Sequence, residues 1–165
     1  MKKTIMLGDS ITEWNPLIDK NIINMGVAGD TTRDIFWRID EVKSIEADKV
    51  VLMAGINDIL MRFPIEKVYE FYKKIVSSLK ENFEEIMLLG VLPIEGDDEI
   101  NMKISQVNSF IEGLEEKNRV CFFDFSKSLF DEEFSLNSSF YTDGLHLSYE
   151  GYESLNKEIL KLLSL

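Results

Sequence analysis

The sequence contains a single histidine, His146, and a single cysteine, Cys121, among its 165 residues. One cysteine cannot form an intrachain disulfide, so nothing in the chain requires an oxidising compartment. A zinc, iron or copper site would lack the nitrogen and sulfur ligands that it normally uses, and neither a metal nor another cofactor is expected. Cys121 stands in an apolar run and is expected to be a small buried hydrophobic residue.

Basic residues are also scarce: 18 Lys and Arg face 30 Asp and Glu, which gives a net charge of −12. Such a charge repels phosphodiesters and anionic lipid headgroups, so a nucleic-acid partner is not expected. No apolar run is long enough to span a bilayer, and the basic start of the chain loses its apolar character at Gly8 and Asp9, too early for an export signal. We therefore expect no stable membrane insertion and a cytoplasmic location.

Linker-like and repetitive segments are missing as well. The chain has only 3 prolines and 9 glycines, and we find no internal repeat and no stretch rich in proline, glycine and serine. A length of 165 residues is typical of one globular domain. The sequence thus predicts a single domain over residues 1–165 and indicates no particular oligomeric state.

Short apolar runs alternate along the chain with longer amphipathic patterns. Consecutive apolar residues are typical of strands buried on both faces, and repeats at three and four residues are typical of helices. Their alternation predicts an α/β fold, a three-layer sandwich with about five parallel strands. The expected strands lie near residues 5–7, 22–23, 50–54, 86–92 and 120–123, and the expected helices near residues 32–42, 65–79, 100–114 and 152–162.

Unusual residues follow several of the predicted strands, where open parallel sheets bind their ligands. The first strand is followed by GDSIT, the second by MGVAGDTT and the third by GINDI. A long loop after the last strand ends at Asp143 and His146, just before a helix that Ser148 is expected to cap. We therefore expect four distant segments to meet at one edge of the sheet.

These segments hold the groups that acyl transfer requires. The Ser10 hydroxyl needs a base to become a nucleophile, and His146 is the only imidazole in the chain. Asp143, three residues earlier, can hold the other ring nitrogen. The amides of Ser10 and Gly26 and the side chain of Asn57 are candidate donors to the oxyanion that forms on attack.

The segments GDSIT, NMGVAGDTT, GIND and DGLHLS resemble, in this order, the four blocks of the GDSL or SGNH hydrolase superfamily. The resemblance implies a flavodoxin-like sandwich and a serine esterase. It assigns Ser10 as the nucleophile, Asp143 and His146 as the rest of a triad, and Gly26 and Asn57 as oxyanion donors together with the Ser10 amide. Many members have proline after the histidine, where this chain has Leu147.

Each position also has a simpler interpretation. Ser10 could be an ordinary turn residue, His146 a hydrogen-bonded structural imidazole, and Asn57 the cap of a turn. Gly26 could serve backbone geometry alone. Asp9 is expected to hold the nucleophile loop by hydrogen bonds rather than to act as a catalytic acid.

Two other classes of protein fit part of the pattern. Asp9, Asp58 and Lys127 could form a magnesium-dependent phosphoacceptor site, as in receiver domains of the same fold. That interpretation gives no role to Asp143 and His146. A catalytically inactive binding module is disfavoured because every catalytic position is filled.

The substrate pocket is the least specified part of the site. A chain this short has little room for a lid, so we expect a shallow pocket that favours small acyl groups such as acetyl. Trp14, Phe63, Ile94 and Tyr141 are candidate pocket walls, although each could instead pack at the edge of the core. The preferred substrates are acetylated carbohydrates or other small soluble esters, with lysophospholipids and thioesters as the alternative.

Overall fold

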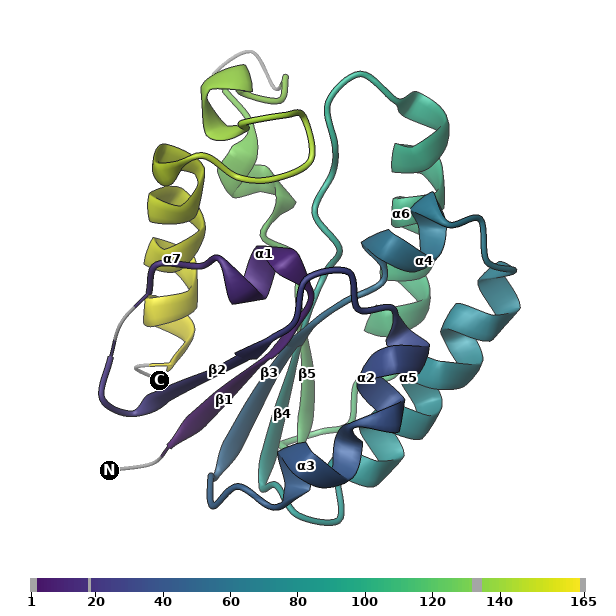
Figure 1. Cartoon of the computed structure of the whole chain (residues 1–165), viewed down its shortest axis with the longest axis vertical. Helices are drawn as coiled ribbons and strands as arrows, with labels where there is room; N and C mark the ends of the chain where they lie inside the picture. Colours follow the sequence, from purple (N-terminus) through teal and green to yellow (C-terminus); the bar gives the residue numbers. More distant parts are fainter. Residues whose placement is uncertain (1–2, 18, 132–134, 164–165) are drawn as a thin grey trace.

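The computed structural model describes residues 3–17, 19–131 and 135–163, and its centre is a five-stranded sheet (Figure 1). The strand order is β2-β1-β3-β4-β5, and every neighbouring pair is parallel. This confirms the predicted parallel sheet and its strand number. The strands are β1 (Thr4–Gly8), β2 (Ile22–Gly26), β3 (Lys49–Met53), β4 (Glu85–Leu89) and β5 (Val120–Phe123).

The consecutive apolar residues of the central strands are explained by burial on both faces. In β3, Val50 and Leu52 belong to one hydrophobic cluster, whereas Val51 and Met53 belong to a second cluster across the sheet. Alternate side chains of a strand point to opposite faces, so a strand covered on both sides must be apolar throughout. The three predicted layers follow from this arrangement.

Helices cover the two faces unequally, as Figure 1 shows. One face packs against α2 to α6, and the other against the short α1, the long α7 and two 3₁₀ turns. No helix within the described ranges is both long and apolar enough to cross a bilayer. The helices are α1 (Ser10–Glu13), α2 (Thr32–Trp37), α3 (Ile39–Lys43), α4 (Ile56–Leu60), α5 (Ile65–Leu79), α6 (Asp98–Glu112) and α7 (Tyr149–Leu163), and the 3₁₀ turns are η1 (Ser126–Leu129) and η2 (Ser138–Phe140).

Three sequence-based expectations need correction. The helix expected over residues 32–42 is two helices, because the backbone leaves helical geometry at Arg38 (φ −102°, ψ 15°). The strand expected to reach Leu92 ends at Leu89, since the backbone of Val91 pairs with the side chain of Asn108 instead of with another strand. Cys121 is only half-buried because β5 lies at the sheet edge.

The two ends of the chain pack together beside the sheet. The Tyr152 hydroxyl in α7 donates to the carbonyl of Ile11 in α1 at 2.9 Å. The side chains of Asn15 and Asn156 exchange two hydrogen bonds of 2.8 Å each. These contacts fix α7 against α1 and Asn15, and so hold the helix that follows His146 beside the helix that begins at Ser10.

Candidate active site

Ser10 is the first residue of α1, directly after β1. The preceding Asp9 caps this helix, because its Oδ1 accepts a hydrogen bond of 3.0 Å from the Ile11 amide. Asp9 is buried, and this burial raises its pKa to about 6. The contacts of Asp9 are those of the structural role expected for it: they hold the turn that presents the Ser10 hydroxyl.

The structure brings Ser10, His146 and Asp143 into one hydrogen-bonded chain. The Ser10 Oγ lies 3.0 Å from His146 Nε2, although 136 residues separate them. On the other side of the ring, His146 Nδ1 lies 2.7 Å from Asp143 Oδ2. This order of hydroxyl, imidazole and carboxylate is the one that activates a serine nucleophile.

Asp143 uses its two oxygen atoms for different purposes. While Oδ2 holds the imidazole, Oδ1 accepts the backbone N–H groups of His146 at 2.7 Å and Leu145 at 3.0 Å. These bonds, the one from the His146 side chain foremost, lower the pKa of Asp143 to about 2. The carboxylate therefore stays ionised over the whole neutral range and can stabilise a positive charge on the ring.

The loop that carries Asp143 and His146 is fixed from the neighbouring strand. Asp143 and Gly144 form a tight turn, in which Asp143 Oδ1 accepts the Leu145 amide and Gly144 adopts a φ of 83°. The Gly144 carbonyl accepts a hydrogen bond of 2.8 Å from the Glu95 amide in the loop after β4. The turn and the contact between Asp143 and His146 are thus parts of one arrangement.

The structure does not support Gly26 as an oxyanion donor. Its amide already donates to the Asn24 side chain at 2.9 Å. A Cβ at this position would lie 2.1 Å from the backbone nitrogen of Glu13, so glycine is required for the close approach of β2 to α1. The simpler interpretation of Gly26, as a backbone requirement, fits these contacts.

Gly29, three residues further on, has the donor that Gly26 lacks. It is exposed, its φ is 86°, and its N–H is the one without an acceptor in the described loop 27–32. Sequence reasoning missed it because two glycines in one motif differ only in their three-dimensional contacts. The other amides of the loop donate as follows: Val27 to Gly8, Ala28 to Glu13, Asp30 to Val27, Thr31 to Asp34 and Thr32 to Asp58.

Asn57 lies next to this loop. It is the second residue of α4, and its Nδ2 donates to the carbonyl of Asp30 at 2.9 Å. A side-chain amide has two N–H groups, so this bond leaves one donor available. The contact joins Asn57 to the residue after Gly29, which places the two candidate donors side by side; it is not the local turn cap considered as the alternative.

The four predicted pocket residues occupy three different environments. The Trp14 ring lies 4.4 Å from the His146 ring, centroid to centroid, and its side chain is half exposed. Tyr141 and Ile94 are buried, and the Tyr141 hydroxyl donates to the Pro93 carbonyl at 2.8 Å. Trp14 is therefore at the candidate site, whereas Tyr141 and Ile94 pack between the loops that support it.

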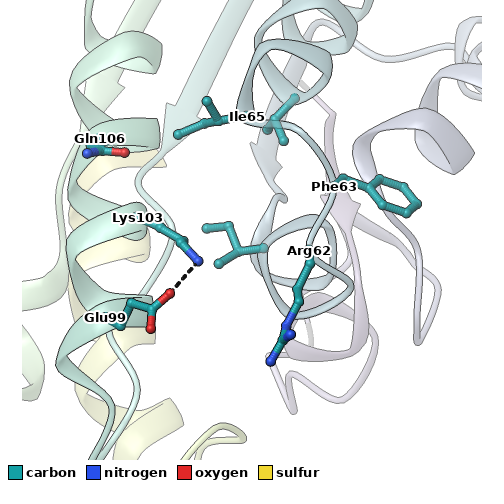
Figure 2. Close-up of a pocket in the computed structure, with 8 residues that line it drawn as sticks. Arg62, Phe63, Ile65, Glu99, Lys103 and Gln106 are labelled. Atoms are coloured by element: carbon teal, nitrogen blue, oxygen red, sulfur yellow. Dashed lines mark hydrogen bonds and ion pairs between the residues drawn. The ribbon is translucent and has the colours of Figure 1, made fainter.

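Phe63 lies at the rim of a separate groove between α4, α5 and α6, and in Figure 2 its ring points away from this groove. The groove has a volume of about 510 Å³, and Ser10, Asp143 and His146 do not line it. The ring of Phe63 lies 5.4 Å from the Arg33 guanidinium. The groove is lined by Ile59, Arg62, Phe63, Ile65, Val68, Glu99, Lys103 and Gln106.

Asp58 does not have the surroundings of a phosphoacceptor. It is buried, and its two oxygen atoms accept hydrogen bonds from the Thr32 amide at 2.9 Å and the Thr32 hydroxyl at 2.7 Å. Lys127 lies exposed in η1. The described residues contain no group of three or more His, Cys, Asp or Glu side chains placed to hold a metal ion. Asp58 instead connects α2 to α4.

Two known proteins are similar to this chain in sequence. Over 167 residues the chain is 27% identical to an N-acylneuraminate cytidylyltransferase of Escherichia coli. The matched region covers 96% of this chain but only 39% of that protein. It is 25% identical over 173 residues to the platelet-activating factor acetylhydrolase IB subunit alpha2 of Rattus norvegicus, covering 96% of this chain and 75% of that one.

Among solved structures, the acetylxylan esterase Axe2 of Geobacillus stearothermophilus has the same fold. Its TM-score is 0.82 at 20% identity, over 97% of this chain and 93% of Axe2. Residues 6–154 match the GDSL-like lipase/acylhydrolase family, a range that includes all four segments at the edge of the sheet. The chain therefore belongs to the GDSL-like lipase/acylhydrolase family and is a carboxylic ester hydrolase.

Proposed function

We propose that this protein is a serine esterase that removes small acyl groups, acetyl above all, from soluble esters through an acyl-enzyme. The observation that carries the proposal is the continuous chain of hydrogen bonds from the Ser10 hydroxyl through His146 to Asp143. Neither bond is longer than 3.0 Å, within the range over which a base takes a serine proton.

Each residue then has a defined step. His146 Nε2 accepts the Ser10 proton as the serine oxygen attacks the ester carbon, and Asp143 stabilises the imidazolium that results. The tetrahedral intermediate collapses when His146 gives this proton to the departing alkoxide, which leaves an acyl group on Ser10. Water, deprotonated by the same imidazole, then attacks the acyl-enzyme and releases the carboxylic acid.

The proposed oxyanion donors are the amides of Ser10 and Gly29 and the remaining N–H of Asn57. Gly29 replaces Gly26, the donor expected from the sequence, because the Gly29 amide is not engaged elsewhere in the described loop, whereas the Gly26 amide donates to Asn24. The bond from Asn57 to the Asp30 carbonyl supports this choice, since it holds the loop of Gly29 against α4. Each such donor contributes on the order of 10² to 10³ in rate.

Acetylated carbohydrates and similar small esters are the proposed substrates. The half-exposed Trp14 indole beside His146 offers a flat apolar surface on which the face of a sugar ring can pack. The names of the similar proteins point the same way, because two of them refer to acetyl groups and two to carbohydrates. Lysophospholipids and thioesters, which are hydrolysed by the same chemistry, are the alternative substrates. The proposed location is the cytoplasm, with which the single cysteine is compatible.

Substitution of the nucleophile and the base tests the mechanism. Ser10→Ala and His146→Ala should each lower kcat for 4-nitrophenyl acetate by about 10³ or more, without loss of the folded state by circular dichroism. Ser109→Ala, at an exposed position in α6, is the matched control and should keep full activity. Full activity of Ser10→Ala would end the proposal.

Asn57→Ala tests the proposed oxyanion donor. This variant should lower kcat about 10²- to 10³-fold, and an unchanged kcat would remove Asn57 from the site.

A substrate panel tests the class of ester. Acetylated sugars, acyl thioesters and lysophospholipids are incubated with the enzyme and with Ser10→Ala, and the released acid is measured. We expect the highest kcat/KM with an acetylated sugar. A higher value with lysophospholipids or thioesters would replace the substrate proposal and leave the mechanism intact.

A further inference from the structure

Arg38 stands at the break between α2 and α3, and its side chain is 17% exposed. The guanidinium donates to three oxygen atoms from three segments of the chain. Nη2 donates to the Gly8 carbonyl at 3.2 Å and to the Met25 carbonyl at 2.9 Å, and Nε donates to Asp30 Oδ2 at 2.7 Å. One side chain thus connects the ends of β1 and β2 with the loop that follows β2.

Two of these three acceptors lie close to a proposed oxyanion donor in the sequence. Gly8 is two residues before Ser10, and Asp30 directly follows Gly29. The Asp30 carbonyl in turn accepts the Asn57 side chain at 2.9 Å. Counted from residue to residue, Gly29 and Asn57 are therefore two steps from the Arg38 guanidinium, both through Asp30, and Ser10 is three steps from it, through Gly8 and Asp9.

The sheet alone does not fix these segments, because the strands end here. Gly8 and Gly26 are the last paired residues of β1 and β2. Past them the Val27 amide still donates to the Gly8 carbonyl at 3.0 Å, but Ser10 and Gly29 lie beyond the ladder. A planar guanidinium presents several N–H groups at fixed angles and can bridge acceptors from several segments. An ammonium group at the end of a lysine side chain is a point charge without this fork.

We infer that Arg38 is a positioning residue for the active site: it sets the spacing of the Ser10 amide, the Gly29 amide and the Asn57 side chain without touching the substrate. This inference rests on the proposed function, in which these three groups bind the oxyanion. Donors aimed at developing charge must be held to within about 0.5 Å, so release of the tether should affect the transition state more than substrate binding.

Arg119 provides a matched control. The Arg119 Nη2 also donates to a backbone carbonyl, that of Lys80. Arg119 directly precedes β5, so it lies at the amino ends of the strands, whereas the candidate site lies at their carboxyl ends. Arg38→Met, Arg38→Lys and Arg119→Met are compared at a temperature well below each Tm. The readouts are kcat and KM for 4-nitrophenyl acetate, their pH dependence, and inhibition by a boronic acid, which forms a tetrahedral adduct on a nucleophilic serine.

We expect Arg38→Met to lower kcat at least tenfold, with KM within about threefold of the original value. Boronate affinity should fall in parallel. The shape of the pH profile should stay the same, because the bonds of Arg38 do not involve His146 or Asp143. Ethylguanidinium should restore part of the activity of Arg38→Ala, and Arg119→Met should keep its kcat.

Several results would overturn the inference. A folded Arg38→Met with the original kcat, beside an inactive Ser10→Ala, would refute the role of Arg38 and leave the proposed function standing. An equal loss of kcat in Arg119→Met would show a general effect of stability. If Arg38→Met does not fold, Arg38→Lys decides, because an unchanged kcat in that variant contradicts a need for the guanidinium fork. Full activity of Ser10→Ala would instead remove the proposed function itself.

Discussion

Asp9 brings a carboxyl group into an environment with almost no water, one residue before Ser10; its exposed fraction is 2%. Burial raises its pKa to about 6, and the negative charges of Asp30 and Asp58 act in the same direction. The folded protein therefore holds a proton on Asp9 more tightly than the unfolded chain, in which the pKa is 3.8. The resulting stabilisation is complete below the unfolded pKa and is lost as the pH rises through about 6.

Asp9→Asn tests this pH dependence. Asparagine can still accept the Ile11 amide but does not ionise, so the variant should gain stability over the original protein as the pH rises. Between about pH 4 and about pH 7.5 the difference in free energy of unfolding should widen by about 1–3 kcal/mol. Urea denaturation at several pH values measures it, with the exposed Asp40→Asn as control. A difference that does not vary with pH would contradict the raised pKa.

Among single residues, the sequence predicts best those whose side chain is the only one of its kind available for the reaction. The lone imidazole, the aspartate three residues before it and the resemblance of all four segments to the GDSL blocks together selected Ser10, Asp143 and His146, and the structure brings these three together. It could not distinguish Gly26 from Gly29, because only a hydrogen bond and a backbone angle separate them.

Among the elements, α4 ends in an unusual way. Arg62 adopts a φ of 58°, and the Phe63 amide donates to the Asp58 carbonyl at 2.9 Å, closing the helix end around a left-handed residue. Glycine is the usual residue at such a position, because a Cβ there costs about 1 kcal/mol. Asn118, with a φ of 62°, has the same conformation but a side chain that tolerates it better.

Arg62→Gly should therefore stabilise the protein. We expect the free energy of unfolding to rise by about 0.5–1 kcal/mol, with an unchanged denaturant m-value. Asn118→Gly is the matched comparison and should give a smaller gain. The midpoint of urea denaturation reports both changes. A lower midpoint for Arg62→Gly would show that the contacts of the Arg62 side chain in the groove stabilise the protein by more than the left-handed backbone conformation destabilises it.

Helices were predictable where one buried face determines the spacing of their apolar residues. The long helices α5, α6 and α7 follow the spacing of their apolar residues, and Ser148 caps α7 as predicted. The break at Arg38 was not predictable, since no proline or glycine marks it. Its side chain has acceptors only in the folded protein.

For the whole molecule, a net charge of −12 creates a field that acts on charged substrates before they bind. Salt screens this field, with a Debye length of about 10 Å at 0.1 M. A neutral ester is insensitive to it, whereas an anionic ester is repelled at low ionic strength. The alternation of strands and helices predicted the three layers of the molecule. The sequence gives the number of charged residues but does not predict where their side chains lie around the candidate site.

Ionic strength should therefore separate two acetate esters with the same acyl group. When NaCl rises from about 10 mM to about 200 mM, kcat/KM for anionic 4-acetoxybenzoate should increase several-fold, while kcat/KM for neutral 4-nitrophenyl acetate stays within about twofold. Initial rates at both salt concentrations provide the measurement. An equal response of the two esters would contradict electrostatic repulsion as the cause.

The contact between Ser10 and His146 spans 136 residues, and α7 must dock on α1 to make it. In the proposed mechanism, a chain synthesised as far as residue 145 carries the nucleophile Ser10 but not the general base His146. We therefore expect copies that lack residues 142–148, or in which α7 has not docked, to be hydrolytically silent. Each turnover in an assay thus counts a polypeptide whose most distant segments have already found each other.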